Sequence, residues 1–233
     1  MDIRTLSRVT AVASLIIGPL AMAIPTTYTE SGAAAAGQLK LAAAHMGQAG
    51  LANAMLLPAL FIVPAMIYAA RLARGRAPRL AFIGGGISAL AWFCGIAGVG
   101  AVDLMVYHGV GVTDRAAVAD LIDRVTGDPV NGTLTVLFVL GHVIGMVVLG
   151  IALWRSRAVP VWGAAVFILY PIVHIAAHVI GSVALDNASG ILLFISGLVC
   201  AVAVLRKPNA EWDLPTVVEH PAESVAEPVP ARL

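Results

Sequence analysis

The sequence predicts an all-α protein: a polytopic transmembrane bundle of six membrane-spanning helices with its N and C termini in the cytoplasm. Hydrophobic residues make up 60% of the chain and charged residues only 12%, whereas a soluble domain carries roughly 25% charged residues. The apolar residues are gathered into six stretches, most of them long enough to cross a hydrocarbon core about 30 Å thick as an α-helix and the shortest about one crossing if slightly extended. The basic loops between these stretches all fall on one side, which the positive-inside rule assigns to the cytoplasm.

These stretches form one transmembrane domain over residues 1–207. Its predicted spans are residues 9–25, 51–70, 80–103, 133–154, 160–183 and 190–205. The first span has a second interpretation, because Arg4 and Arg8 precede an apolar core that ends near the small residues Ala21 and Ala23. That pattern is also typical of a secretory signal peptide with its cleavage site, and the sequence leaves both interpretations open.

The second and third spans carry residues that modify a helix. Pro58 and Pro64 lie inside the second span and predict a kink, which a membrane tolerates where neighbouring helices satisfy the freed carbonyl groups. The third span is rich in glycine, at Gly84, Gly85, Gly86, Gly95 and Gly98. Small residues of this kind let another helix approach closely.

The predicted orientation depends on three basic segments. They contain Arg71, Arg74, Arg76 and Arg79 after the second span, Arg155 and Arg157 after the fourth, and Arg206 and Lys207 after the sixth. Short loops with several arginines stay on the cytoplasmic side. We therefore expect a multi-pass protein of the cytoplasmic (inner) cell membrane, with the lipid bilayer as its surroundings.

Two segments outside the spans have distinct patterns. Residues 113–127 place apolar side chains at helical spacing and predict an amphipathic helix on the outer membrane surface. Thr113 or Asp114 caps its start, and its apolar stripe lies in lipid or against the bundle.

Residues 208–233 contain five prolines and few large apolar residues, so we expect a disordered cytoplasmic tail. Within this tail, Trp212 is expected to touch the lipid headgroups.

Three histidines provide the best functional lead. His142 lies in the fourth span, and His174 and His178 lie in the fifth. These two spans are consecutive and joined by a short turn, so we expect them to be neighbouring antiparallel helices. At about 1.5 Å per residue, His142 and His174 lie roughly 18 and 22 Å from the cytoplasmic ends of their helices. His178 follows one turn later on the face of His174. Ionisable residues within a membrane are costly and usually functional.

Three interpretations of these histidines stay open. The first is a haem or transition-metal site made by His142, His174 and His178, since imidazole is a common ligand for both. The second is movement of protons or small solutes by a transporter or transporter subunit, with an outer relay or second site at His45, Asp103 and His108. The third is packing: the histidines bond to neighbouring helices, and the glycine-rich span supports a homo-oligomer or a membrane partner.

Other classes of function are not expected. A net charge of +1 argues against nucleic acid as a partner. The sequence has no HExxH, G-x-S-x-G, P-loop or dinucleotide-binding motif, so an enzyme that acts on soluble substrates is not expected. Cys94 and Cys200 lie in apolar runs and are interpreted as small buried hydrophobic residues.

Three segments resemble an uncharacterised family of small six-helix integral membrane proteins of high-GC bacteria. They are the R-x-R-A-P-R-L turn at Arg74 to Leu80, the L-G-I-A-L-W-R-S-R segment at Leu149 to Arg157, and the aspartate-rich helix before Pro129. The resemblance covers most of residues 51–205. It implies a fold and no activity.

Overall fold

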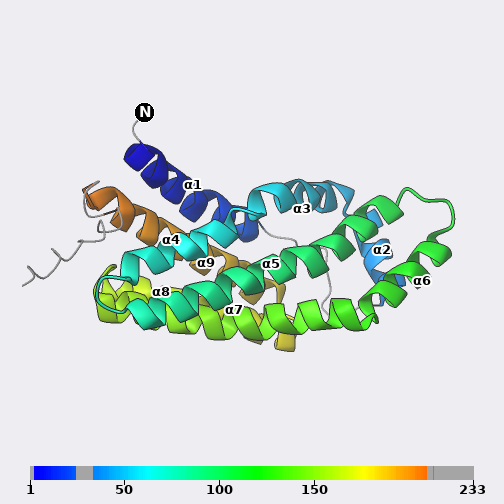
Figure 1. Ribbon diagram of the computed structural model, residues 1–233. Helices are drawn as coiled ribbons and strands as arrows, with labels where there is room; N and C mark the ends of the chain where they lie inside the picture. The colour runs from blue at the N-terminus through cyan, green and yellow to red at the C-terminus, as the bar shows by residue number, and fades with distance from the viewer. Residues whose placement is uncertain (1–2, 25–33, 209–211, 213–233) are drawn as a thin grey trace, which may run out of the picture.

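The computed structural model describes residues 3–24, 34–208 and 212, which form α-helices and no strand. The all-α class predicted from the sequence is therefore confirmed. The helices are α1 (Ile3–Ala23), α2 (Ala35–Ala44), α3 (Met46–Ala59), α4 (Ile62–Ala73), α5 (Pro78–Gly109), α6 (Arg115–Thr126), α7 (Pro129–Ser156), α8 (Val161–Ile180) and α9 (Val183–Arg206) (Figure 1).

Five helices are long and apolar enough to cross a membrane: α1, α5, α7, α8 and α9. The count becomes six if α3 and α4, which are bent by 45° at a short break, form one span. The break at Leu60 and Phe61 has a chemical cause. Pro64 has no N–H to donate to the carbonyl of Leu60 four residues earlier, and its ring clashes with that carbonyl. The kink predicted for residues 51–70 is thus confirmed.

The five membrane-length helices and α4 close into a ring. α5 packs along α7, α7 on α8, α8 on α9, α9 on α1, α1 on α4, and α4 on α5. Buried side chains such as Leu15, Met66 and Leu149 fill the interior. The α4–α5 and α7–α8 turns and the end of α9 lie together at one end of the bundle (Figure 1), which we call the arginine end because Arg74, Arg76, Arg155, Arg157 and Arg206 lie there.

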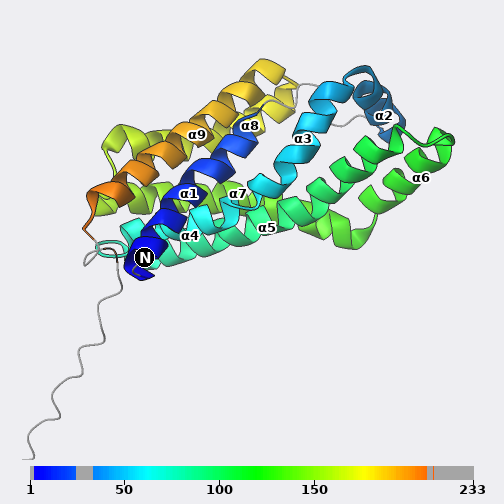
Figure 2. The same ribbon diagram turned by 90° about the horizontal axis from the view of Figure 1, so that it is seen from above.

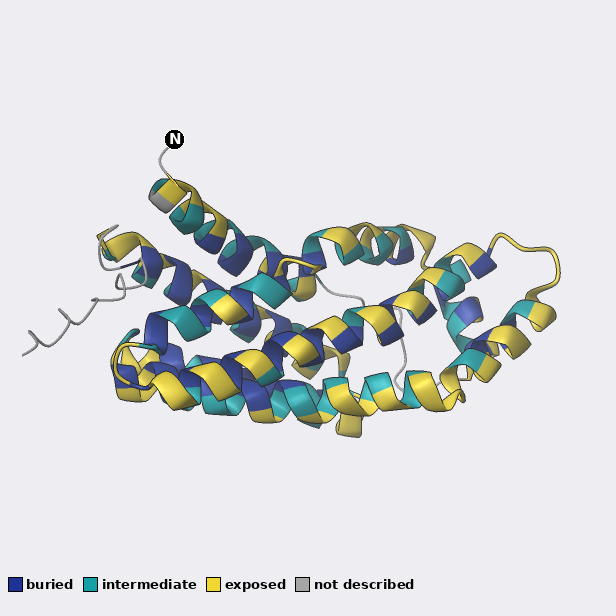
Figure 3. Ribbon diagram, in the orientation of Figure 1, coloured by how far each residue is buried: buried dark blue, intermediate teal, exposed yellow. Residues whose placement is uncertain are grey.

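The outward faces of the long helices carry large apolar side chains. Phe82 and Phe93 on α5, Leu140 on α7 and Ile191 on α9 are all more than half exposed, and Figure 3 shows the exposed residues along the outside of α5 and α7. A soluble protein rarely exposes so much continuous apolar surface. A lipid environment accounts for it, and the chain is accordingly a helical membrane protein.

Glycine brings α5 and α7 into close contact. A Cβ atom on Gly84 would lie 2.5 Å from the backbone nitrogen of Leu149, and one on Gly145 would lie 2.6 Å from that of Ser88. Gly85 and Gly95 are likewise covered by Ala70 and Phe138 of the same chain. Gly84, Gly85 and Gly95 of the predicted third span therefore serve packing within the chain, whereas Gly86 faces no neighbour within 4 Å.

The end remote from the arginine end has a small hydrophobic core of its own. With 32 and 28 residues, α5 and α7 are about 48 and 42 Å long, longer than the hydrocarbon core is thick. The far end of α5 packs with α2, α3 and α6 around Leu39, Val106 and Ile122. Asp114 caps α6 by accepting a hydrogen bond of 3.0 Å from the backbone of Ala117, as predicted, and the buried face of α6 lies against the protein.

Trp212 is buried at the arginine end. Its side chain is 1% exposed, its Nε1 donates to Ser7 Oγ over 3.1 Å, and the Arg71 guanidinium lies 4.5 Å from the centre of its ring. The expected headgroup contact is therefore replaced by contacts with α1 and α4. Apart from Pro208 and Trp212, the predicted tail of residues 208–233 lies outside the described residues.

Candidate functional site

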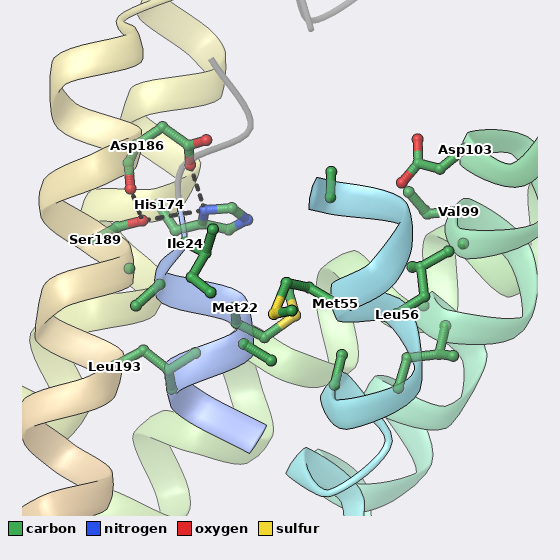
Figure 4. A pocket seen from close by; sticks show the side chains of 18 of the residues that line it. Met22, Ile24, Met55, Leu56, Val99, Asp103, His174, Asp186, Ser189 and Leu193 are labelled. Atoms are coloured by element: carbon green, nitrogen blue, oxygen red, sulfur yellow. Dashed lines mark hydrogen bonds and ion pairs between the residues drawn. The ribbon is translucent and has the colours of Figure 1, made fainter. Parts of the chain in front are cut away.

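The candidate site is built on the hairpin of α8 and α9. Gly181, with a left-handed φ of 71°, ends α8, and Ser182 caps α9. This two-residue connection folds the first turns of α9 back along the last turns of α8. As a result Asp186 and Ser189 of α9 lie beside His174 of α8 (Figure 4).

Asp186 orients the His174 ring. The Nδ1 atom of His174 lies 2.9 Å from Asp186 Oδ1 and 3.3 Å from Ser189 Oγ. A carboxylate can only accept a hydrogen bond, so Nδ1 carries the proton and donates it to Asp186. The Nε2 atom of His174 then presents a lone pair. A histidine held in this way by a carboxylate is the usual arrangement of a metal-ligating imidazole.

His178 lies one helical turn after His174, and the two Nε2 atoms are 3.2 Å apart. Two imidazoles that bind one tetrahedral zinc ion at about 2.0–2.1 Å hold their nitrogen atoms roughly 3.3–3.4 Å apart. The separation of these two nitrogens therefore matches that of two ligands on one ion. Without an ion, the same distance suits a hydrogen bond in which His178 Nε2–H donates to the lone pair of His174.

Asp186 is also close enough to contribute an oxygen. One ligand atom from each of His174, His178 and Asp186 can be chosen so that all lie within 4.8 Å of one another. Among the described residues this is the group of histidine, cysteine and carboxylate side chains that could hold a metal ion. The His174 and Asp186 side chains are 20% and 36% exposed, so the group is accessible.

His142 lies next to this group but does not belong to it. Its ring is in edge contact with that of His174, with 5.6 Å between their centres, and it stacks on Phe138 of its own helix. Its Nδ1 is 3.0 Å from the Phe138 carbonyl oxygen. The side chain is 1% exposed, and its Nε2 is buried without a hydrogen-bond partner among the described residues.

Aromatic side chains enclose the histidines from the bundle interior. Trp92 contacts the rings of His142 and Phe138, and Tyr170 stacks on His174. Trp92 Nε1, like His142 Nε2, has no hydrogen-bond partner within the described part of the chain. Two unpaired polar atoms in one buried cluster are uncommon in a native protein and call for a functional or structural reason.

The predicted outer residues are not gathered into one second site. Asp103 lines a cavity of about 370 Å³, together with His174 and His178. His45 sits at the junction of α2 and α3 and is exposed. His108 is exposed and packs edge-on against Tyr107. Of these three, only Asp103 shares a cavity with the histidine pair.

Two familiar chemistries do not fit this geometry. A haem with two axial histidines needs a gap for the macrocycle between the imidazoles, but the rings of His142 and His174 touch, and His174 and His178 share one helix face. A Ser-His-Asp hydrolase needs serine and aspartate on opposite ring nitrogens, but Ser189 and Asp186 both contact Nδ1 of His174.

Sequence reasoning found His174 and His178 but missed Asp186 as their partner. Asp186 follows His174 by 12 residues, across a connection that contains Gly181 and Ser182. Counting equal distances from the ends of the two helices pairs His174 with Ser189, and Asp186 lies three residues before Ser189 on the same face of α9. That count could have placed Asp186 near His174. The roles of Trp92 and Tyr170 could not be found in this way, because they depend on how separate helices pack.

Comparison with protein-family models, with curated proteins and with solved structures finds no match to this chain. Function must therefore be argued from the site. Fold and site together define the class: an α-helical membrane protein with a cluster of two histidines and an aspartate between two adjacent helices.

Proposed function

We propose that this chain is a multi-pass protein of the cytoplasmic (inner) cell membrane that binds a transition-metal ion such as Zn²⁺ through the Nε2 atoms of His174 and His178. One observation carries the proposal: these atoms lie 3.2 Å apart while Asp186 holds the other nitrogen of His174. Imidazole is a good ligand for zinc and neighbouring transition metals. We assign Asp186 the role of orienting His174, with a carboxylate oxygen close enough to approach the ion.

The depth of the site supports exchange of the ion with one side of the membrane. At 1.5 Å per residue, His174 and His178 lie roughly 20 and 26 Å along α8 from the arginine end, and Asp186 roughly 30 Å along α9. With the arginine end in the cytoplasm, the site lies near the outer boundary of the hydrocarbon core. The site has few protein ligands and partial exposure, which is typical of sites with an open coordination position.

The test is equilibrium binding of Zn²⁺ to the full-length protein, purified in detergent with an affinity tag that contains no histidine. We expect one ion per chain, and an affinity lowered more than about 100-fold in His174→Ala and in His178→Ala, since each removes a ligand. His108→Ala is the matched control, because His108 is an exposed histidine of α5 outside the group. Wild-type affinity in both ligand variants would refute the site.

Transport of a small cation is the second candidate function. It is favoured by the cavity that Asp103 and the histidine pair both line, because a purely structural protein has no need of opposed ionisable groups on a cavity wall. In proteoliposomes, wild-type protein should then carry Zn²⁺ across the bilayer and His174→Ala should not. Binding without flux would leave a metal-binding protein that does not transport.

A further inference from the structure

The cavity lined by Asp103, His174 and His178 contains space that the proposed metal site does not use. It is lined by residues of α1, α3, α5, α7, α8 and α9 and by Gln38 of α2. Figure 2 shows that the end of α8 and the start of α9 lie apart from the C-terminal half of α5 in this region. The cavity volume of about 370 Å³ falls within the range of small-molecule sites, about 300–1,000 Å³. It is therefore large enough for an organic ligand.

Asp103 is the unpaired charge of this cavity. Its carboxylate makes no hydrogen bond or ion pair with any residue that the structure describes, and its side chain is partly buried. No lysine or arginine is among the described residues that line the cavity. A carboxylate that is partly buried among apolar residues is costly unless a cation accompanies it. The second carboxylate, Asp186, lies on the opposite wall and is engaged by His174.

Most of the remaining lining is apolar, sulfur-containing or aromatic, and the polar exceptions are Gln38, Asn187 and Ser189. Met22 and Met55 project into the space between the Asp103 wall and the His174 wall (Figure 4). Methionine adapts its shape to irregular apolar bodies. Trp92 and Tyr170 contribute aromatic surface, and aromatic faces attract cations, quaternary ones in particular.

We propose that the cavity binds a lipophilic organic cation, with its positive charge near Asp103 and its apolar body against Met22, Met55 and Trp92. A neutral apolar ligand would leave Asp103 without a countercharge, and an anion would be repelled by it. Among the described residues, Asp103 belongs to no group of three histidine, cysteine or carboxylate side chains that could hold a bare metal ion. The inference does not rest on the proposed metal site, because Asp103 belongs to a different helix and is no part of the histidine group.

The test uses two probes of the same shape and opposite charge, tetraphenylphosphonium and tetraphenylborate. Binding is measured by equilibrium dialysis against the full-length protein in nanodiscs of uncharged lipid, with empty nanodiscs subtracted. Wild-type protein should bind the phosphonium cation saturably and the borate anion only by partition. Asp103→Asn should weaken cation binding about tenfold or more, and Asp103→Glu, which keeps the charge, should stay within about threefold of wild type.

Two further variants separate a lost site from a lost fold. Met55→Trp fills the cavity and keeps Asp103, so it should also abolish saturable cation binding. Asp120→Asn removes an exposed carboxylate of α6 and should change nothing. Equal binding by wild type and Asp103→Asn, saturable binding of the borate anion, or no saturable binding of the cation to wild type would each overturn the proposal. His174→Ala, which tests the metal site, should leave cation affinity within threefold.

Discussion

His174 and His178 hold their Nε2 atoms 3.2 Å apart, and the far side of the His174 ring is tied to Asp186 at 2.9 Å. The first distance arises from helical periodicity, which aligns residues four apart. The second arises from the tight connection between α8 and α9. Together they fix which nitrogen of His174 carries a proton and which presents a lone pair, and the first two predictions below depend on that assignment.

Replacing Asp186 should weaken the metal site without destroying it. In Asp186→Ala the His174 ring loses the acceptor that orients it and raises its basicity, and outer partners of this kind contribute about 10–100-fold to metal affinity. Zinc titration of the purified variant measures the loss, with Asp120→Ala as the control. Unchanged affinity would show that Asp186 does not support His174. Complete loss of binding would make Asp186 a ligand.

Metal affinity should fall as the pH is lowered. Zinc binds the neutral imidazoles of His174 and His178, so each proton that these rings take up competes with the ion. The logarithm of the apparent affinity should therefore drop with falling pH, with a limiting slope of up to two protons per ion. Zinc titrations across the acidic range measure this slope. An affinity independent of pH would exclude a site made of histidines.

His142→Phe should keep the ion and the fold. A phenyl ring can retain the stacking on Phe138 and the contact with His174, and it removes a buried nitrogen that has no partner among the described residues. An unsatisfied buried polar atom costs about 1–3 kcal/mol, so the melting temperature should not fall. Thermal melting and zinc titration test this together. Loss of the ion with a normal melt would place His142 among the ligands.

Gly145→Ala should destabilise the bundle. The added Cβ would lie 2.6 Å from the backbone of Ser88, so α7 must move away from α5, at a cost of about 1–3 kcal/mol. Gly86→Ala is the matched control on the same helix pair, because nothing lies within 4 Å of its Cβ position. Alanine is also the better helix former by about 1 kcal/mol. Equal melting temperatures for both variants would contradict the close packing of α5 and α7.

Much of the fold was predictable because it depends on local chemistry. The apolar stretches define helices, Pro64 defines the break before α4, and Asp114 defines the start of α6. Whether α3 and α4 form one span depends on their path through the lipid, and the number of residues does not determine that path. The buried position of Trp212 was missed because it depends on partners from both ends of the chain, Ser7 and Arg71.

The candidate site was predictable only in part. The pair of His174 and His178 is a local pattern on one helix, and the contact of His142 with His174 follows from neighbouring antiparallel helices. The cavity that joins Asp103 to the histidine wall is formed by residues of six helices, α1, α3, α5, α7, α8 and α9, and by Gln38 of α2. No spacing in the sequence encodes such an enclosure, which emerges only when the helices pack.

The most direct measurement of the central claim is X-ray absorption at the zinc edge on the zinc-loaded protein, which counts imidazole ligands by their outer-shell scattering. The proposed site predicts two imidazoles at about 2.0–2.1 Å from zinc in wild-type protein and one in His178→Ala. It also predicts an unchanged spectrum in His108→Ala. A wild-type spectrum without imidazole scattering, or one that His178→Ala leaves unaltered, would contradict the account.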